Sequence, residues 1–118
     1  MTISYQTEKE WEIALVEAEG NIFRTVQDML DVIGDCAWNG AEILIVQESH
    51  LAPEFFDLKS GLAGEILQKF SNFRMKLGII GDFSKYESIS LRDFMRESNR
   101  SGTIFFVSNF EELLLKLN

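Results

Sequence analysis

Apolar and polar positions alternate near the amino terminus and then give way to continuous apolar runs. Residues 3–7 and 11–16 repeat with a period of two, which is the spacing of a strand with one covered face. The polar link between them is short enough for a hairpin. The apolar runs follow at residues 43–46, 77–80 and 104–107, and such runs are typical of strands covered on both faces in a parallel sheet.

Helical patterns separate and follow these runs, and their starts are marked by capping residues. Thr25 with Asp28 resembles a capping box, Ser90 is expected to begin the third helix, and Asn109 with Glu112 begins the fourth. The first helix is expected to bury Val26, Met29, Leu30, Ile33 and Ala37. The second is expected to bury Leu62, Ile66, Leu67, Phe70 and Phe73.

The element order is therefore β-β-α-β-α-β-α-β-α, with a short helical turn expected at Pro53. Parallel strands joined by helices need right-handed crossovers. We predict a single α/β domain over residues 1–118, with a mixed, mostly parallel five-stranded sheet and flanking helices.

Composition narrows the class of partner. The formal net charge of −8 disfavours nucleic acid and anionic membrane, because both require clustered Lys and Arg. Cys36 is the only cysteine, so no disulfide can form within the chain, and we expect it to be a packed core residue. No signal peptide or membrane-length apolar stretch is seen, so a cytoplasmic location is expected.

Ser60 stands at the expected start of the second helix, within the stretch Asp57-Leu58-Lys59-Ser60-Gly61-Leu62. Its hydroxyl could cap the helix by accepting from the N–H of residue 62 or 63. A phosphate at the same place would meet unpaired N–H groups and the positive end of the helix dipole. We therefore consider both a capping role and regulation by phosphorylation, with Asp57, Ser60, Gly61 and Leu62 as a partner-binding segment.

The loop Asp82–Tyr86 follows the second apolar run and carries two aromatic residues, Phe83 and Tyr86. Aromatic residues on such loops often anchor protein interfaces. They could equally fold back over the core. If the topology is right, this loop lies at the same edge of the sheet as Ser60.

An alternative site uses Glu48, His50 and Asp82, which come directly after two predicted strands. The carboxyl ends of strands are where α/β sheets usually bind ligands, and such side chains could hold a divalent metal. These residues also make turns and caps. No glycine-rich nucleotide motif is present, so no cofactor is predicted, and no catalytic residue can be named.

The element order resembles that of STAS domains, the anti-anti-sigma factor family. In that family an Asp-Ser-Ser-Gly-Leu motif follows the third strand and its second serine is phosphorylated by a partner kinase; Ser60-Gly61-Leu62 is similar to its end. Nearly the whole chain also resembles a bacterial family known as a domain of unknown function, DUF4180. Three blocks carry that likeness: FFDLKSGLAGEILQKF, KLGIIGDFSKY and SLRDFMRESN.

These observations favour a non-enzymatic regulatory module that binds a protein partner of unknown identity. Its docking surface is expected around Ser60 to Leu62 and the Asp82–Tyr86 loop. The alternative is a small enzyme or ligand-binding domain. A homodimer is a further possibility, with Phe55-Phe56 buried between subunits. Arg92, Arg96 and Arg100 could form a solvated face that pairs with Asp93 or Glu97, or could meet an acidic partner or the acidic face of a second copy.

Overall fold

The computed structural model describes residues 1–117 and contains one five-stranded sheet in the order β1-β2-β3-β4-β5. The strands are β1 Thr2–Glu8, β2 Trp11–Glu17, β3 Ile43–Gln47, β4 Lys76–Ile80 and β5 Ile104–Val107. β1 pairs antiparallel with β2, and every other neighbouring pair is parallel. The predicted fold class, α/β with a mixed and mostly parallel sheet, is confirmed.

Within residues 1–117, four helices alternate with the strands in the predicted order: α1 Val26–Trp38, α2 Leu62–Phe73, α3 Ile89–Ser101 and α4 Phe110–Lys116. Three short 3₁₀ turns lie between β3 and α2: η1 Glu48–His50, η2 Pro53–Phe56 and η3 Leu58–Ser60. Pro53 opens η2, as its fixed φ predicts. The long β3–α2 connection is thus built from ordered turns.

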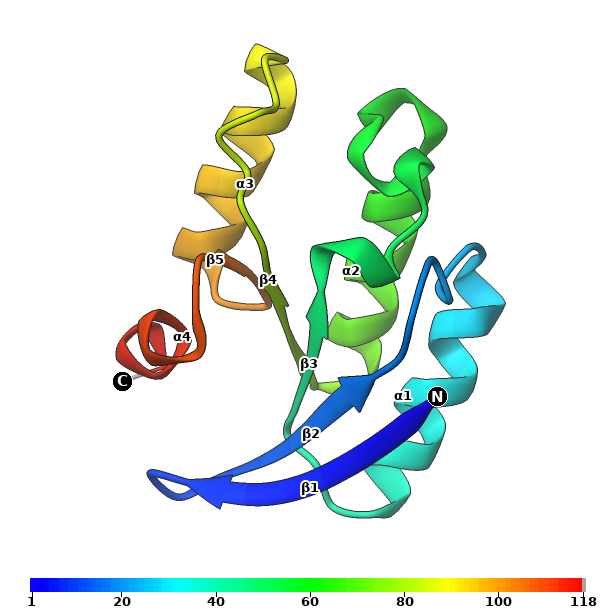
Figure 1. Cartoon of the computed structure of the whole chain (residues 1–118), viewed down its shortest axis with the longest axis vertical. Helices are drawn as coiled ribbons and strands as arrows, with labels where there is room; N and C mark the ends of the chain where they lie inside the picture. Colours follow the sequence, from blue (N-terminus) through cyan, green and yellow to red (C-terminus); the bar gives the residue numbers. More distant parts are fainter. Residues whose placement is uncertain (118) are drawn as a thin grey trace.

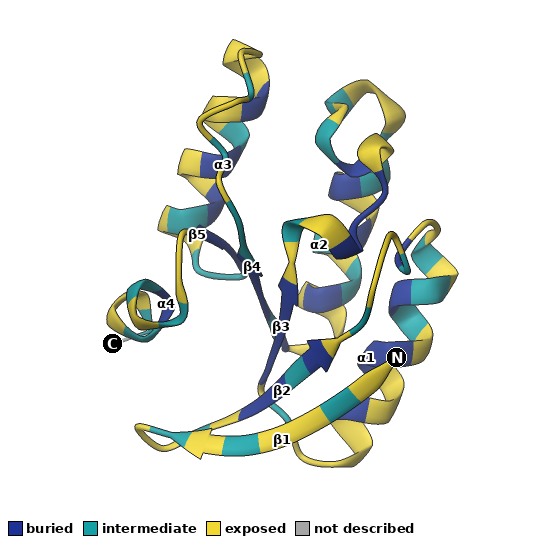
Figure 2. Cartoon of the chain, viewed as in Figure 1, coloured by how far each residue is buried: buried dark blue, intermediate teal, exposed yellow. Residues whose placement is uncertain are grey.

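The helices cover the two faces of the sheet unequally. Because successive strands are added in one direction, right-handed crossovers put α1, α2 and α3 on the same face. Met29, Ile66 and Leu91 from these helices share one core cluster, whereas Leu113 of α4 packs in a second cluster on the other face. Figure 1 shows α4 across the sheet from α1 and α2. In Figure 2 the central strands are buried and β1 is mostly exposed.

Two of the three predicted helix caps are confirmed. Thr25 and Asp28 form the capping box of α1, and the Asn109 side chain accepts from the Glu112 N–H. The third was wrong: Ser88, not Ser90, caps α3, because its hydroxyl accepts from the Leu91 N–H. The Ser90-Leu91-Arg92-Asp93 pattern imitates a cap within the first turn of a helix that has already begun.

Two predicted core positions lie at the surface. Ala37 is exposed while Cys36 is buried, since position 36 follows Met29 and Val32 on the face that meets the sheet. Phe73, the last residue of α2, is 47% exposed. The prediction that Cys36 packs in the core is confirmed.

Candidate functional site

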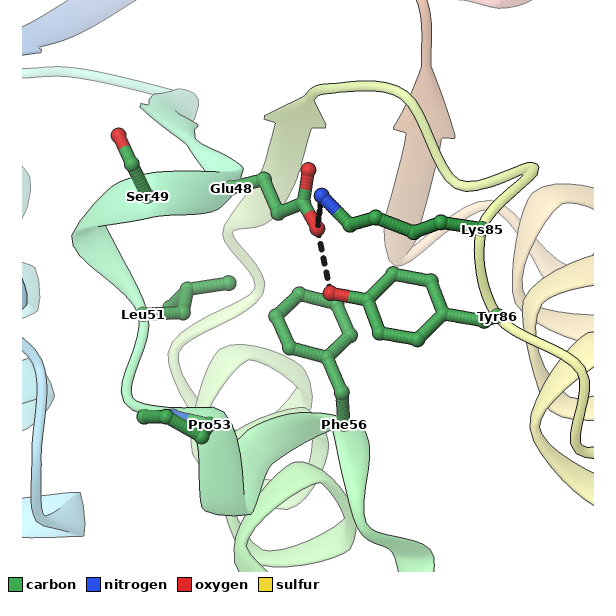
Figure 3. Close-up of a pocket in the computed structure, with 7 residues that line it drawn as sticks. All are labelled: Glu48, Ser49, Leu51, Pro53, Phe56, Lys85 and Tyr86. Atoms are coloured by element: carbon green, nitrogen blue, oxygen red, sulfur yellow. Dashed lines mark hydrogen bonds and ion pairs between the residues drawn. The ribbon is translucent and has the colours of Figure 1, made fainter.

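A pocket of about 280 Å³ lies where β3 and β4 end. It is lined by Glu48, Ser49, Leu51, Pro53, Phe56, Lys85 and Tyr86, and these seven residues are called the groove below. Figure 3 shows that they come from the turns after β3 on one side and from the loop after β4 on the other. The groove therefore occupies the edge of the sheet at which α/β proteins usually bind ligands.

Glu48 ties the two sides of the groove together. Its Oε2 accepts a hydrogen bond from the Tyr86 hydroxyl and lies 2.8 Å from the Lys85 Nζ (Figure 3). The Glu48 side chain is only 13% exposed. Burial and the hydrogen bond to Glu48 raise the pKa of Tyr86 far above its ordinary value, so the phenol stays protonated and donates.

The position of Glu48 depends on a glycine across the groove. A Cβ placed on Gly81 would lie 2.6 Å from the Glu48 Cβ and 2.7 Å from its Oε1. The φ of Gly81 lies outside the left-handed region, so its role is steric rather than conformational. The absence of a side chain at position 81 lets Glu48 lie against the end of β4.

Aromatic rings form the wall of the groove and continue into the core. The rings of Phe56 and Tyr86 stack at 4.8 Å between centroids, and Phe83 meets Phe106 edge-on at 5.3 Å. Phe83 and Tyr86 thus fold back over the core, while Tyr86 also lines the groove. Phe55 is fully buried within the chain, which removes it from any surface between subunits.

His50 joins the ends of two strands and is 2% exposed. Its Nδ1 accepts from the Gln47 N–H at 3.0 Å, and its Nε2 lies 2.9 Å from the Ala18 carbonyl oxygen. Because a carbonyl only accepts, the Nε2–H form satisfies both contacts. Both ring nitrogens are therefore occupied by backbone groups.

Asp82 is bound within its own turn. Its Oδ1 accepts from the Ser84 hydroxyl at 2.6 Å and from the Ser84 N–H at 3.0 Å, and these bonds lower the pKa of Asp82. Among residues 1–117, no three His, Cys, Asp or Glu side chains are grouped so that they could hold a metal ion. Glu48, His50 and Asp82 lie near the same edge but each has different partners.

The Ser60 segment lies at the entrance to α2. The Ser60 hydroxyl donates to the Glu54 carbonyl at 2.6 Å and accepts from the Leu62 N–H at 3.2 Å. The predicted contact with residue 62 is confirmed, although α2 begins only at Leu62, after Gly61 with φ +81°. The Asp57 side chain accepts from the Lys59 N–H and caps η3. Ser60 therefore fastens η3 to η2, the turn that carries Phe56.

Sequence reasoning missed four members of the groove: Ser49, Leu51, Pro53 and Phe56. Lys85 lies within the predicted Asp82–Tyr86 loop but was not singled out. The sequence contains only part of the information needed to place these residues in one site. The sequence predicts a turn that starts at Pro53, yet nothing local shows that Phe56 at its end stacks on a ring thirty residues later. Leu51 is held by an isolated parallel β-bridge to Phe23. This bridge joins two loops that are far apart in the sequence, so no local pattern predicts it.

A family model described as Domain of unknown function (DUF4180) matches residues 8–117. The chain belongs to the DUF4180 family. The matched region of this DUF4180 chain includes every residue of the groove and the whole Ser60 segment. No curated protein and no solved structure matches the chain. In the described part of this DUF4180 protein, residues 1–117, no helix has the length and apolar character needed to span a membrane.

Proposed function

We propose that this protein is a non-enzymatic regulatory module that binds a protein partner through the groove. The observation that carries the proposal is the construction of the groove itself. Its wall is the flat face of the Phe56–Tyr86 stack, and beside it the exposed Pro53 adds further apolar surface, with the largely buried Leu51 also lining the recess. An apolar recess with an aromatic wall is suited to an anchoring side chain of a partner.

The polar groups of the groove support binding more than acid–base catalysis. Tyr86 has a raised pKa and stays a hydrogen-bond donor at neutral pH, so it is a poor general base. Glu48 already accepts from Tyr86 and Lys85. In the alternative site at Glu48, His50 and Asp82, the imidazole is not available as a ligand, because both ring nitrogens of His50 bond to the backbone.

Ser60 offers a route for regulation that reaches the groove through η2. A phosphate on Ser60 would remove the donor that now satisfies the Glu54 carbonyl and would bring negative charge beside that oxygen. Asp57 would add repulsion. Release of η2 would move Phe56 away from Tyr86 and alter the wall of the groove. The likeness of Ser60-Gly61-Leu62 to the STAS phosphorylation motif supports the same switch.

Photo-crosslinking in the cells from which the gene comes tests the docking site. The photoreactive residue p-benzoylphenylalanine is placed at Ser49, on the exposed rim of the groove, and at Ser4, an exposed position on β1. We expect a partner to crosslink from position 49 and not from position 4. The crosslink should disappear with Phe56→Ala and persist with Phe73→Ala, a matched change at an exposed site.

Equal crosslinking from both positions, or a position 49 crosslink that survives Phe56→Ala in a folded protein, would refute the docking site. Folding is checked by circular dichroism, and Phe56→Leu gives a milder second variant. The switch is tested by Ser60→Ala and Ser60→Asp in the same assay. Equal recovery of the partner with wild type and both variants would refute the switch while leaving the docking site intact.

A further inference from the structure

The charges around the groove identify the kind of partner segment it fits. Four exposed carboxylates flank the groove in sequence: Glu54, Asp57, Asp82 and Glu87. Glu54 lies between Pro53 and Phe56, and Glu87 directly follows Tyr86, so exposed carboxylates neighbour the lining residues of both sides in the chain. These four carboxylates are called the acidic rim below. A partner that approaches this rim is favoured if it is basic.

Lys85, the one lysine of the groove, does not cancel the negative charge of these carboxylates. Lys85 is already paired with Glu48 at 2.8 Å, and its ammonium lies 5.5 Å from the centre of the Tyr86 ring. Its charge is therefore largely neutralised within the protein. The contact also shows that the aromatic wall can face a cation.

Glu48 retains one free hydrogen-bond acceptor within the part of the chain that the structure describes. Glu48 uses Oε2 for both Tyr86 and Lys85, and among residues 1–117 its Oε1 has no hydrogen-bond partner. A Cβ at Gly81 would lie 2.7 Å from Oε1, so this oxygen lies close to the backbone of Gly81. An incoming ammonium, guanidinium or backbone N–H could bond to Oε1.

We infer that the groove binds a segment of another protein in which an apolar side chain stands next to lysine or arginine. The apolar side chain packs against Leu51, Pro53 and the face of Phe56, and the cation meets Glu48 Oε1 and the acidic rim. This inference rests on the proposed function, because it names the chemistry of the partner at the same groove.

Selection of short random peptides displayed on phage tests this chemistry with the whole protein. We expect enriched peptides to pair a leucine or an aromatic residue with lysine or arginine. Synthetic copies should bind wild type and Phe73→Ala but not Phe56→Ala, which places them in the groove.

A charge-matched pair of variants then separates local from long-range attraction. Glu54→Lys with Glu87→Lys reverses the rim, whereas Glu10→Lys with Asp35→Lys makes the same change in net charge at the opposite end of the sheet. Basic peptides should lose about tenfold or more in affinity with the rim variant and about twofold or less with the control. Equal losses would overturn the inference.

The remaining outcomes distinguish this inference from the proposed function. Acidic peptides that bind the groove and are strengthened by the rim variant would overturn the partner chemistry and leave the docking site standing. Peptides that all ignore Phe56→Ala would overturn the docking site itself. If the protein forms a dimer that the rim variant dissociates, the occupant is a second copy of this chain, and the inference of a separate basic partner fails.

Discussion

Substitution of Gly81 by alanine should destabilise the protein through Glu48 rather than through the backbone. The new Cβ would lie 2.6 Å from the Glu48 Cβ, an atom that cannot move without the η1 backbone. Overpacking of this kind costs about 1 to 3 kcal/mol, and a weakened hydrogen bond from Tyr86 to a carboxylate adds about 1.5 kcal/mol or more. The exposed Lys85 contact contributes at most about 1 kcal/mol. We expect a loss of about 2.5 to 4.5 kcal/mol in the free energy of unfolding.

Urea denaturation followed by circular dichroism measures this loss as a fall in the midpoint of about 1 to 2 M. Gly34→Ala is the matched control, because a Cβ there meets nothing within 4 Å on the surface of α1. It should stabilise the protein by about 0.5 to 1 kcal/mol. In a Glu48→Gly background, Gly81→Ala should cost less than about 1 kcal/mol. If Gly81→Ala is as stable as wild type, the packing of Glu48 against the end of β4 is refuted.

Three further predictions concern His50, the cap of α3 and Tyr86. His50→Ala should lower the free energy of unfolding by about 2 to 3 kcal/mol, because it removes a buried side chain and leaves the Gln47 N–H and the Ala18 carbonyl without their partner. A change below about 1 kcal/mol in urea denaturation would contradict its bridging role. Ser88→Ala should lower the free energy of unfolding by about 1 kcal/mol through loss of the cap, and Ser90→Ala should lower it clearly less. A lower denaturation midpoint for Ser90→Ala than for Ser88→Ala would contradict the assigned start of α3. The Tyr86 pKa is raised, so its contribution to stability is complete below the ordinary value of 10.0 and declines as pH rises above it. Ultraviolet titration of wild type minus Tyr86→Phe should show this late ionisation, and Glu48→Gln should bring the pKa of Tyr86 down; no change with Glu48→Gln would exclude Glu48 as a cause.

The positions of the strands along the chain could be predicted from the local pattern of apolar residues. The period and the length of an apolar run depend directly on which faces of a strand are buried. The runs at residues 43–46 and 104–107 became strands with at most one added residue. Helix starts were less certain, since Ser88 and Ser90 both offer a hydroxyl and a helical pattern downstream. Only the backbone at Ser88, with ψ of 121°, decides which one caps.

The site was predictable in location but not in composition. Residues that follow strands, such as Glu48, Asp82 and Tyr86, do gather at one edge of the sheet, as parallel topology requires. Their partners could not be read from sequence, because the whole β3–α2–β4 crossover lies between Glu48 and Tyr86. His50 illustrates the limit: an imidazole that could serve as a ligand is instead used to join β2 to β3.

The position of the docking site is measured most directly by amide chemical shifts of the ¹⁵N-labelled protein during titration with a peptide enriched in the phage selection. The largest shifts should fall in residues 48–56 and 82–87, the two sides of the groove. Shifts concentrated instead on the exposed faces of α1 and α2, or along β1, with the groove residues unchanged, would contradict the proposed docking site.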